Sequence, residues 1–190
     1  MPAAGTALVN HEVRKPPRLS RQISVVVGKF LFQWREIIGA TAFLVVYLFG
    51  NPSHRSCFRG LPFILAGLIL RFWAMGYIGA SARTRTIEIR KVVSNGPYRI
   101  FPHPIYAGNF MLVIGVLIVL NLDIRLALGV VAGFLGEYGL IARAEEQFLG
   151  EHREVPKPVK FDWHRAWCDW STWVVTGLVY LLCLMRIGWS

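Results

Sequence analysis

The sequence predicts an all-α protein, a polytopic membrane bundle of about five transmembrane helices with its N-terminus in the cytoplasm. Three observations support this fold class. Of the 190 residues, 54% are hydrophobic and only 17% are charged, which is too apolar for an ordinary soluble domain. Five apolar runs approach the length of about 20 helical residues that a bilayer requires. Lys and Arg are also distributed unevenly between the loops on the two sides of these runs.

The first 29 residues are expected to form a basic cytoplasmic segment. Its first 22 residues contain no short apolar core followed by a small-residue cleavage site, so we expect no cleaved signal peptide. Residues 30–190 are expected to form a single membrane domain, because a chain of this length is too short for more than one.

Five apolar runs are the candidate membrane spans, and the third and fifth are short. Sixteen Lys and Arg residues precede or begin the first run or lie in the loops on that same side, whereas four lie on the other side. Because cytoplasmic loops carry an excess of basic residues, this distribution predicts a cytoplasmic N-terminus and a multi-pass integral membrane protein. The runs are 30–49, 61–80, 105–120, 124–141 and 173–187.

The formal net charge of +10 also bears on the partners of the chain. The basic residues lie between apolar runs and form no contiguous stripe, which favours a membrane surface and membrane lipids over nucleic acid. Cys57, Cys168 and Cys183 are odd in number and far apart, so we expect neither a disulfide framework nor a metal site. Their expected role is packing.

The third and fourth runs are joined by the short segment 120–124, which predicts an antiparallel helical hairpin. In the fourth run, Gly129, Gly133 and Gly136 recur at intervals of four and three residues. Such small-residue patterns let two membrane helices approach closely, so we expect these glycines to pack against a neighbouring helix.

Aromatic residues recur at short intervals before the last apolar run. Their spacing is typical of a belt at the headgroup level of the bilayer. An aromatic platform for a substrate is the alternative. The residues are Phe161, Trp163, Trp167, Trp170 and Trp173.

The most informative segment lies before the third run. Gly96-Pro97 predicts a turn, and Pro104 is well placed to open the third helix. His103 and Tyr106 are three residues apart across that helix start, so their side chains are expected to project to the same side. The backbone donors of the first helical turn could hold a carboxylate or another anion. A structural helix cap is the alternative role for His103.

Carboxylates gather at the end of the fourth run. Glu145 and Glu146 follow the apolar residues directly, where a helix C-terminus disfavours negative charge, so a cationic ligand would explain their position. A solvated helix end is the alternative. Glu137 lies inside the apolar run, where an unpaired charge costs several kcal/mol. We therefore expect Glu137 to face the bundle, towards Arg71 or the pocket.

Together these segments resemble the signature of the isoprenylcysteine carboxyl methyltransferase and phospholipid methyltransferase superfamily over about residues 61 to 150. The resemblance rests on Gly96-Pro97-Tyr98, on the run from His103 to Gly108, on the hairpin, and on Arg143 with Glu145-Glu146. It implies a membrane methyltransferase that binds S-adenosyl-L-methionine from the cytoplasmic side in a pocket formed mainly by residues 83–110 and 137–150. The implied catalytic residues are His103, Arg143, Glu145 and Glu146. The implied cofactor contacts are Arg90, Lys91, Val92, Val93, Tyr98, His103, Pro104, Ile105, Tyr106, Glu145 and Glu146.

The resemblance also implies an amphiphilic methyl acceptor, either an isoprenylcysteine-like carboxylate or a lipid, and no metal. Two alternatives stay open. Membrane sterol-type reductases carry a similar His-Pro-x-Tyr segment but use NADPH, and a non-catalytic membrane scaffold could retain a vestigial pocket. Binding of S-adenosylmethionine, of NADPH or of neither distinguishes the three.

Overall fold

The structure is a computed structural model that describes residues 19–79, 93–152 and 158–188. Within this part, the side chains of Glu145 and Glu146 lie outside the described residues, although their backbone is helical. The described residues form α-helices and one short 3-10 helix without any strand, which confirms the predicted all-α class. In chain order, the elements are α1 (Leu19–Phe49), α2 (His54–Ile78), η2 (Gly96–Arg99), α3 (Pro104–Val119), α4 (Ile124–His152), α5 (Trp163–Trp167) and α6 (Trp170–Gly188).

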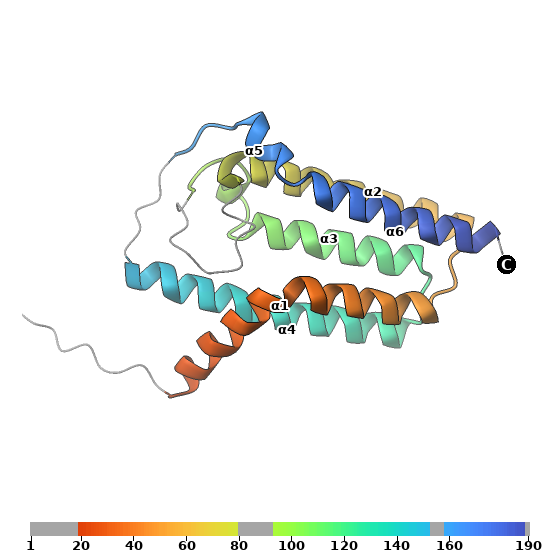
Figure 1. Ribbon diagram of the computed structural model, residues 1–190, viewed down its shortest axis with the longest axis horizontal. Coiled ribbons are helices and arrows are strands. Elements are labelled where there is room, and N and C mark those ends of the chain that lie inside the picture. Colours follow the sequence, from red (N-terminus) through yellow and green to blue (C-terminus); the bar gives the residue numbers. More distant parts are fainter. Residues whose placement is uncertain (1–18, 80–92, 153–157, 189–190) are drawn as a thin grey trace, which may run out of the picture.

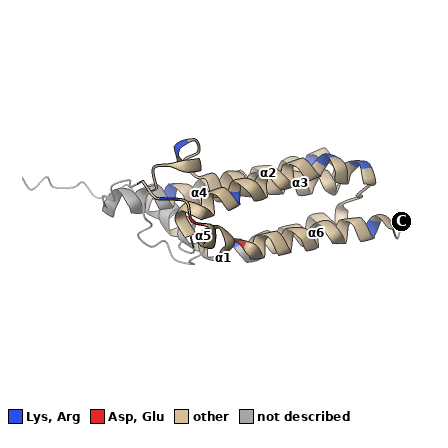
Figure 2. Ribbon diagram, turned by 90° about the horizontal axis from the view of Figure 1, so that it is seen from above, with Lys and Arg blue, Asp and Glu red and all other residues tan. Residues whose placement is uncertain are grey.

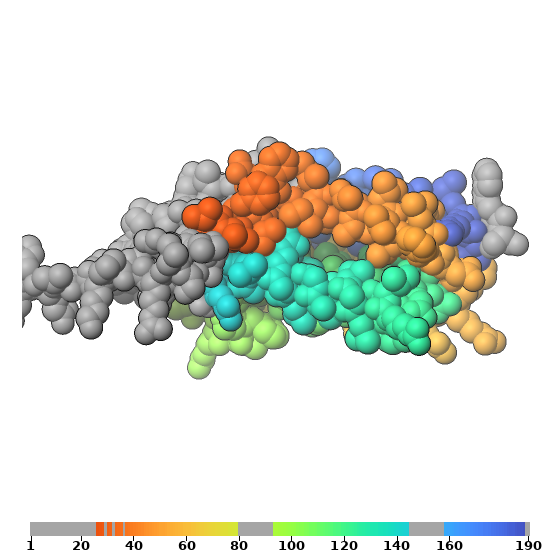
Figure 3. Space-filling model, turned by 90° about the horizontal axis from the view of Figure 1, so that it is seen from below, coloured from red at the N-terminus to blue at the C-terminus, as the bar shows by residue number. Residues whose placement is uncertain are grey.

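The long helices lie side by side as an elongated bundle (Figure 1). α2 packs most extensively against α3, and α1 against α4, whereas α3 and α4 touch each other little despite their tight connection. The space-filling view shows α1 and α4 running along each other over one face (Figure 3). The bundle therefore consists of an α2–α3 pair, against which α5 and α6 pack, and an α1–α4 pair.

Glycines explain the close approach of α2 and α3. A Cβ atom added to Gly60 would lie 2.5 Å from the carbonyl oxygen of Gly115, and one added to Gly67 would lie 2.8 Å from the carbonyl oxygen of Gly108. The two pairs are seven residues apart on each helix, about two turns, so they form one continuous seam. The two backbones can approach this closely only because none of these four positions carries a side chain.

The glycines of α4 behave differently, and the expectation about them is wrong. A Cβ atom added to Gly129, Gly133 or Gly136 would meet nothing within 4 Å among the described residues. Each of these three glycines is exposed. Small-residue spacing defines a face of a helix but does not say whether another helix covers that face.

The helix ends opposite the α3 start are tied together by polar contacts. The Ser53 hydroxyl accepts a hydrogen bond from the Ser56 backbone N–H at 3.2 Å, and the Ser56 hydroxyl donates to the Val119 carbonyl of α3 at 2.7 Å. Arg186 of α6 donates to the Tyr47 carbonyl and lies over the Tyr47 ring. Because the last carbonyls of a helix lack partners within the helix, Arg186 caps α1 from a neighbouring helix.

Several helices are suited to crossing a membrane. By length and composition, α2, the part of α4 up to Ala144, and Trp163–Gly188 qualify, and α1 is a fourth candidate if its two parts are counted as one span. Those parts, Val26–Arg35 and Ile37–Phe49, are bent by 62°. α3 has 16 residues and is shorter than a typical span, so the predicted number of five is approximate. Among the residues that the figure colours, most Lys and Arg positions lie towards the ends of the bundle (Figure 2).

Candidate active site

The loop before α3 is fixed from two sides. Gly96 has a φ of +64°, and a Cβ atom on it would lie 2.5 Å from the Tyr77 ring of α2, so only glycine fits there. The side-chain amide of Asn95 donates to the Val159 carbonyl at 2.7 Å and accepts from the Val159 N–H at 3.0 Å. The predicted turn is therefore present, and both α2 and the segment before α5 hold it.

His103 and Tyr106 form the aromatic start of α3. Pro104 is the first residue of the helix, as predicted, and His103 is the N-cap residue, although its side chain makes no capping hydrogen bond. The His103 and Tyr106 rings are stacked, with centroids 5.3 Å apart and an interplanar angle of 16°. This stacking agrees with the expectation that both side chains project to the same side. The first intrahelical donor is Ala107, which leaves the Ile105 N–H without an acceptor in the helix.

Tyr138 connects this aromatic pair to α4. The Tyr106 and Tyr138 rings meet edge to face, with centroids 4.9 Å apart, and Tyr138 is stacked on Phe134 at 4.2 Å. The side-chain amide of Asn109 also donates to the Tyr138 hydroxyl at 2.9 Å. These contacts bring the start of α3 against the later turns of α4.

A buried ion pair between α2 and the segment before α6 supports the same region. Arg71 of α2 contacts Asp169 through two hydrogen bonds, Nε to Oδ2 at 3.0 Å and Nη2 to Oδ1 at 2.7 Å. The exposed fraction is 9% for Arg71 and 0% for Asp169. Arg71 also donates to Thr172 Oγ1 at 3.1 Å and to the Asn109 side chain. A continuous polar network therefore runs from Asp169 through Arg71 and Asn109 to Tyr138.

The partner of Arg71 corrects a sequence-based expectation. Glu137 was one candidate, but Asp169 fills that role, and Arg35 of α1 supplies a positive charge that acts on Glu137. Oε1 of Glu137 is buried without a hydrogen-bond partner among the described residues. Sequence reasoning missed Asp169, Asn109 and Tyr138. The available signal was Arg71 itself, because a charge inside a membrane helix requires a buried partner.

The remaining predicted residues are distributed as follows. Val93 is buried, and Tyr98 is partly buried, with its hydroxyl 3.5 Å from the Ala74 carbonyl of α2, to which it donates. Pro104 is fully buried, and Ile105 is partly exposed.

Arg143 is exposed and makes no hydrogen bond or ion pair with the described residues. The backbone and side chains of Arg90, Lys91 and Val92 lie outside the described residues.

The position of Glu145 follows from the geometry of α4. Glu145 comes seven residues after Tyr138, which is nearly two full helical turns and about 10 Å along the axis. Its backbone therefore lies on the same face of α4 as Tyr138. α4 extends past the start of α3, on the side where the 93–103 loop lies (Figure 1).

The arrangement favours an organic cation that also carries an anionic group. Stacked rings attract cations, and the start of α3 supplies backbone N–H donors. Among the described residues, no group of three or more His, Cys, Asp or Glu side chains could hold a metal ion. The site residues that can be described are therefore aromatic rings, backbone donors and the polar network beneath them.

Residues 60–149 match the Isoprenylcysteine carboxyl methyltransferase (ICMT) family. This segment runs from the beginning of the α2–α3 seam through the candidate site to α4, and it agrees with the extent of the resemblance seen in the sequence. No curated protein and no solved structure matches the chain.

Proposed function

We propose that the chain is a membrane methyltransferase that transfers the methyl group of S-adenosylmethionine to an amphiphilic acceptor. The match of residues 60–149 to the isoprenylcysteine carboxyl methyltransferase family supports this proposal. The observation that carries this proposal is the contact between Tyr106 and Tyr138. It joins the His103 segment to the helix that leads to Glu145. We therefore propose that both segments of the family signature contribute to one site.

The residues fit S-adenosylmethionine, which carries a sulfonium, an amino group and a carboxylate. The Ile105 N–H at the start of α3 lacks an intrahelical acceptor and suits the carboxylate. The His103 and Tyr106 rings can favour the positive sulfonium through the ring faces that their mutual stacking leaves uncovered. Glu145 and Glu146 are proposed to balance the positive charge of the donor, and Arg90 to bind its carboxylate.

When bound, S-adenosylmethionine supplies a methyl group that is already electrophilic. The protein must therefore hold donor and acceptor in line and exclude water. The Asn109–Tyr138 hydrogen bond and the Arg71–Asp169 ion pair restrict the movement of the Tyr138 ring, which contacts Tyr106. A carboxylate acceptor requires no base, whereas an amine acceptor must lose a proton, which His103 or a glutamate could accept.

The acceptor is proposed to be amphiphilic because the site lies at one end of an apolar bundle. Exposed apolar side chains continue from the site along α4, for example Leu135, which is 56% exposed. An apolar tail can therefore remain in the bilayer while the reacting group reaches the loop. The excess of basic residues in the loops on this side predicts that the site faces the cytoplasm.

Titration of the purified full-length chain with S-adenosylmethionine tests the proposal. We expect the wild type to bind, and His103→Ala and Glu145→Gln each to weaken binding by about tenfold, which corresponds to the loss of one charge-assisted or cation–ring contact. His54→Ala is the matched control, because His54 is an exposed histidine at the opposite end of α2. Wild-type titrations from both site variants would remove the site assignment.

A parallel titration with NADPH separates the alternatives. Binding of NADPH in place of S-adenosylmethionine would identify a reductase, and binding of neither would identify a scaffold. Incubation of membranes with S-adenosylmethionine carrying an isotopically labelled methyl group, followed by mass spectrometry, then identifies the acceptor directly. The absence of any labelled product with a chain that binds the donor would contradict methyl transfer.

A further inference from the structure

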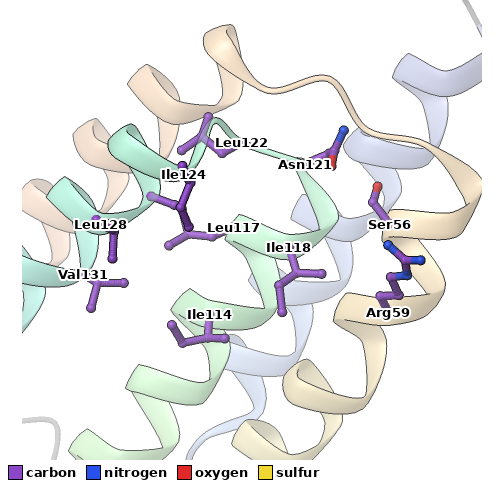
Figure 4. Close-up of a pocket in the computed structure, with 11 residues that line it drawn as sticks. Ser56, Arg59, Ile114, Leu117, Ile118, Asn121, Leu122, Ile124, Leu128 and Val131 are labelled. Atoms are coloured by element: carbon purple, nitrogen blue, oxygen red, sulfur yellow. The ribbon is translucent and has the colours of Figure 1, made fainter.

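A cavity of about 360 Å³ lies at the end of the bundle opposite the candidate active site. It opens where α3 turns into α4 and where α2 begins (Figure 4). α3 separates the two ends by 16 residues, or about 24 Å, so this far-end cavity is distinct from the site around His103. It is lined by Ser56, Arg59, Ile114, Leu117, Ile118, Asn121, Leu122, Ile124, Ala127, Leu128 and Val131.

The lining has one polar side and one apolar side. Figure 4 shows Ser56 and Arg59 on α2 and Asn121 in the turn, whereas the side chains from α3 and α4 are aliphatic. The Ser56 hydroxyl is already used, since it donates to the Val119 carbonyl. Among the described residues, neither the Arg59 guanidinium nor the Asn121 side-chain amide has a hydrogen-bond or ion-pair partner.

The charge around the cavity is positive. Arg55 and Arg125 are exposed at the same end of the bundle, and the acidic side chain there, Asp123, accepts a hydrogen bond from the backbone N–H of Arg125. Arg59 lies five residues after the first residue of α2, about 8 Å along its axis.

The apolar wall continues to the outer surface of the bundle. Ile124 is 67% exposed and Leu128 is 60% exposed, although both line the cavity. The cavity lies beside the tight turn between α3 and α4, two helices that touch each other little. A ligand can therefore enter sideways from the bilayer.

We propose that the far-end cavity binds an anionic phospholipid. Its phosphate is held by the Arg59 guanidinium and the Asn121 amide, and the upper part of an acyl chain lies against the aliphatic side chains of α3 and α4. Arg59 supplies a positive charge that has no partner among the described residues, which favours an anion. The adjoining aliphatic wall favours hydrocarbon over a fully hydrated ligand. An anion attached to an acyl chain therefore satisfies both sides of the cavity. This inference does not depend on the proposed methyltransferase activity.

Lipid selectivity measured by electron paramagnetic resonance tests the inference. The full chain is reconstituted in phosphatidylcholine bilayers that contain spin-labelled phosphatidylglycerol or spin-labelled phosphatidylcholine. We expect the wild type to prefer phosphatidylglycerol, and Arg59→Gln to reduce that preference by about fivefold, the ratio expected for one basic side chain near a lipid phosphate. Arg59→Lys keeps the charge and should retain most of the preference.

Two further variants distinguish a built site from general attraction by the basic surface. Arg55→Gln removes one charge from the same helix without altering the lining and should reduce the preference much less than Arg59→Gln does. Ala127→Phe fills the apolar side without changing any charge and should reduce the preference. An unchanged preference in Arg59→Gln, or equal losses in Arg55→Gln and Arg59→Gln, would overturn the proposal.

Discussion

The two helix pairs of the bundle are held together in different ways. α2 and α3 meet backbone to backbone at Gly60, Gly67, Gly108 and Gly115, and a buried ion pair fastens α2 to the segment before α6. α4 carries just as regular a set of glycines, yet these face no described part of the protein. The α2–α3 pair is therefore a rigid platform, and the candidate site lies where α4 contacts that platform through Tyr138.

Small residues therefore stabilise a membrane bundle only where another backbone covers them. Dispersion contacts and interhelical hydrogen bonds replace the hydrophobic effect inside a bilayer. Substitutions in the two pairs should therefore have unequal effects on stability, and the following variants test this expectation.

Asp169→Ala should have the largest effect. It leaves the buried Arg71 guanidinium without its counter-ion, which we expect to cost about 3–5 kcal/mol of unfolding free energy. Unfolding of the full chain in mixed micelles by a denaturing detergent measures this cost. Asp123→Ala is the control, because Asp123 is exposed and its side chain accepts a hydrogen bond from a backbone N–H in the first turn of α4. The double variant Arg71→Met with Asp169→Leu removes both charges and should recover most of the loss.

Gly67→Ala should destabilise the α2–α3 pair by about 1–3 kcal/mol, the usual cost of overpacking. The new methyl group would lie 2.8 Å from the Gly108 carbonyl oxygen and 2.9 Å from Leu112 Cγ, so the two backbones must separate. The same unfolding measurement applies. Wild-type stability in this variant would show that the seam is looser than its distances indicate.

Tyr138→Phe should have a smaller effect, about 1 kcal/mol, because it removes one partly buried hydrogen bond from Asn109 and keeps the ring contact with Tyr106. Tyr77→Phe is the matched control, since the Tyr77 hydroxyl has no hydrogen-bond partner among the described residues. If the two variants lose equal stability, the Asn109 contact contributes nothing measurable.

Gly133→Ala should have the smallest effect. We expect the free energy of unfolding to stay unchanged or to rise by up to about 1 kcal/mol. An added Cβ atom meets nothing within 4 Å, and alanine favours the helix more than glycine does. Thermal unfolding of this variant beside Gly67→Ala gives the sharpest contrast between the two helix pairs. A large loss in Gly133→Ala would contradict the exposed position of this face.

Local features of the fold and site could be predicted from the sequence. Proline and glycine impose backbone geometry wherever they stand, so the Gly96-Pro97 turn and the start of α3 at Pro104 were predictable. The tight turn near Asn121 follows from the length of the connection alone. His103 and Tyr106 stack because their spacing along one helix determines their relative direction.

Contacts between distant helices could not be predicted in the same way. Spacing identifies a glycine-rich face on α4, but it carries no information about which helix, if any, covers that face. Arg71 required a buried partner, yet both Glu137 and Asp169 were chemically suitable, and only the packing of α6 against α2 decides between them. The lateral arrangement of helices therefore had to come from the structure.

The ion pair between α2 and Asp169 also has a consequence for biogenesis. Arg71 is synthesised 98 residues before Asp169, which at ordinary rates of translation is an interval of about 5–20 s. During that time the guanidinium must remain at the translocon or extend to the membrane surface, because its native counter-ion Asp169 has not yet emerged from the ribosome. The last helix to be made thus completes the insertion of one of the first.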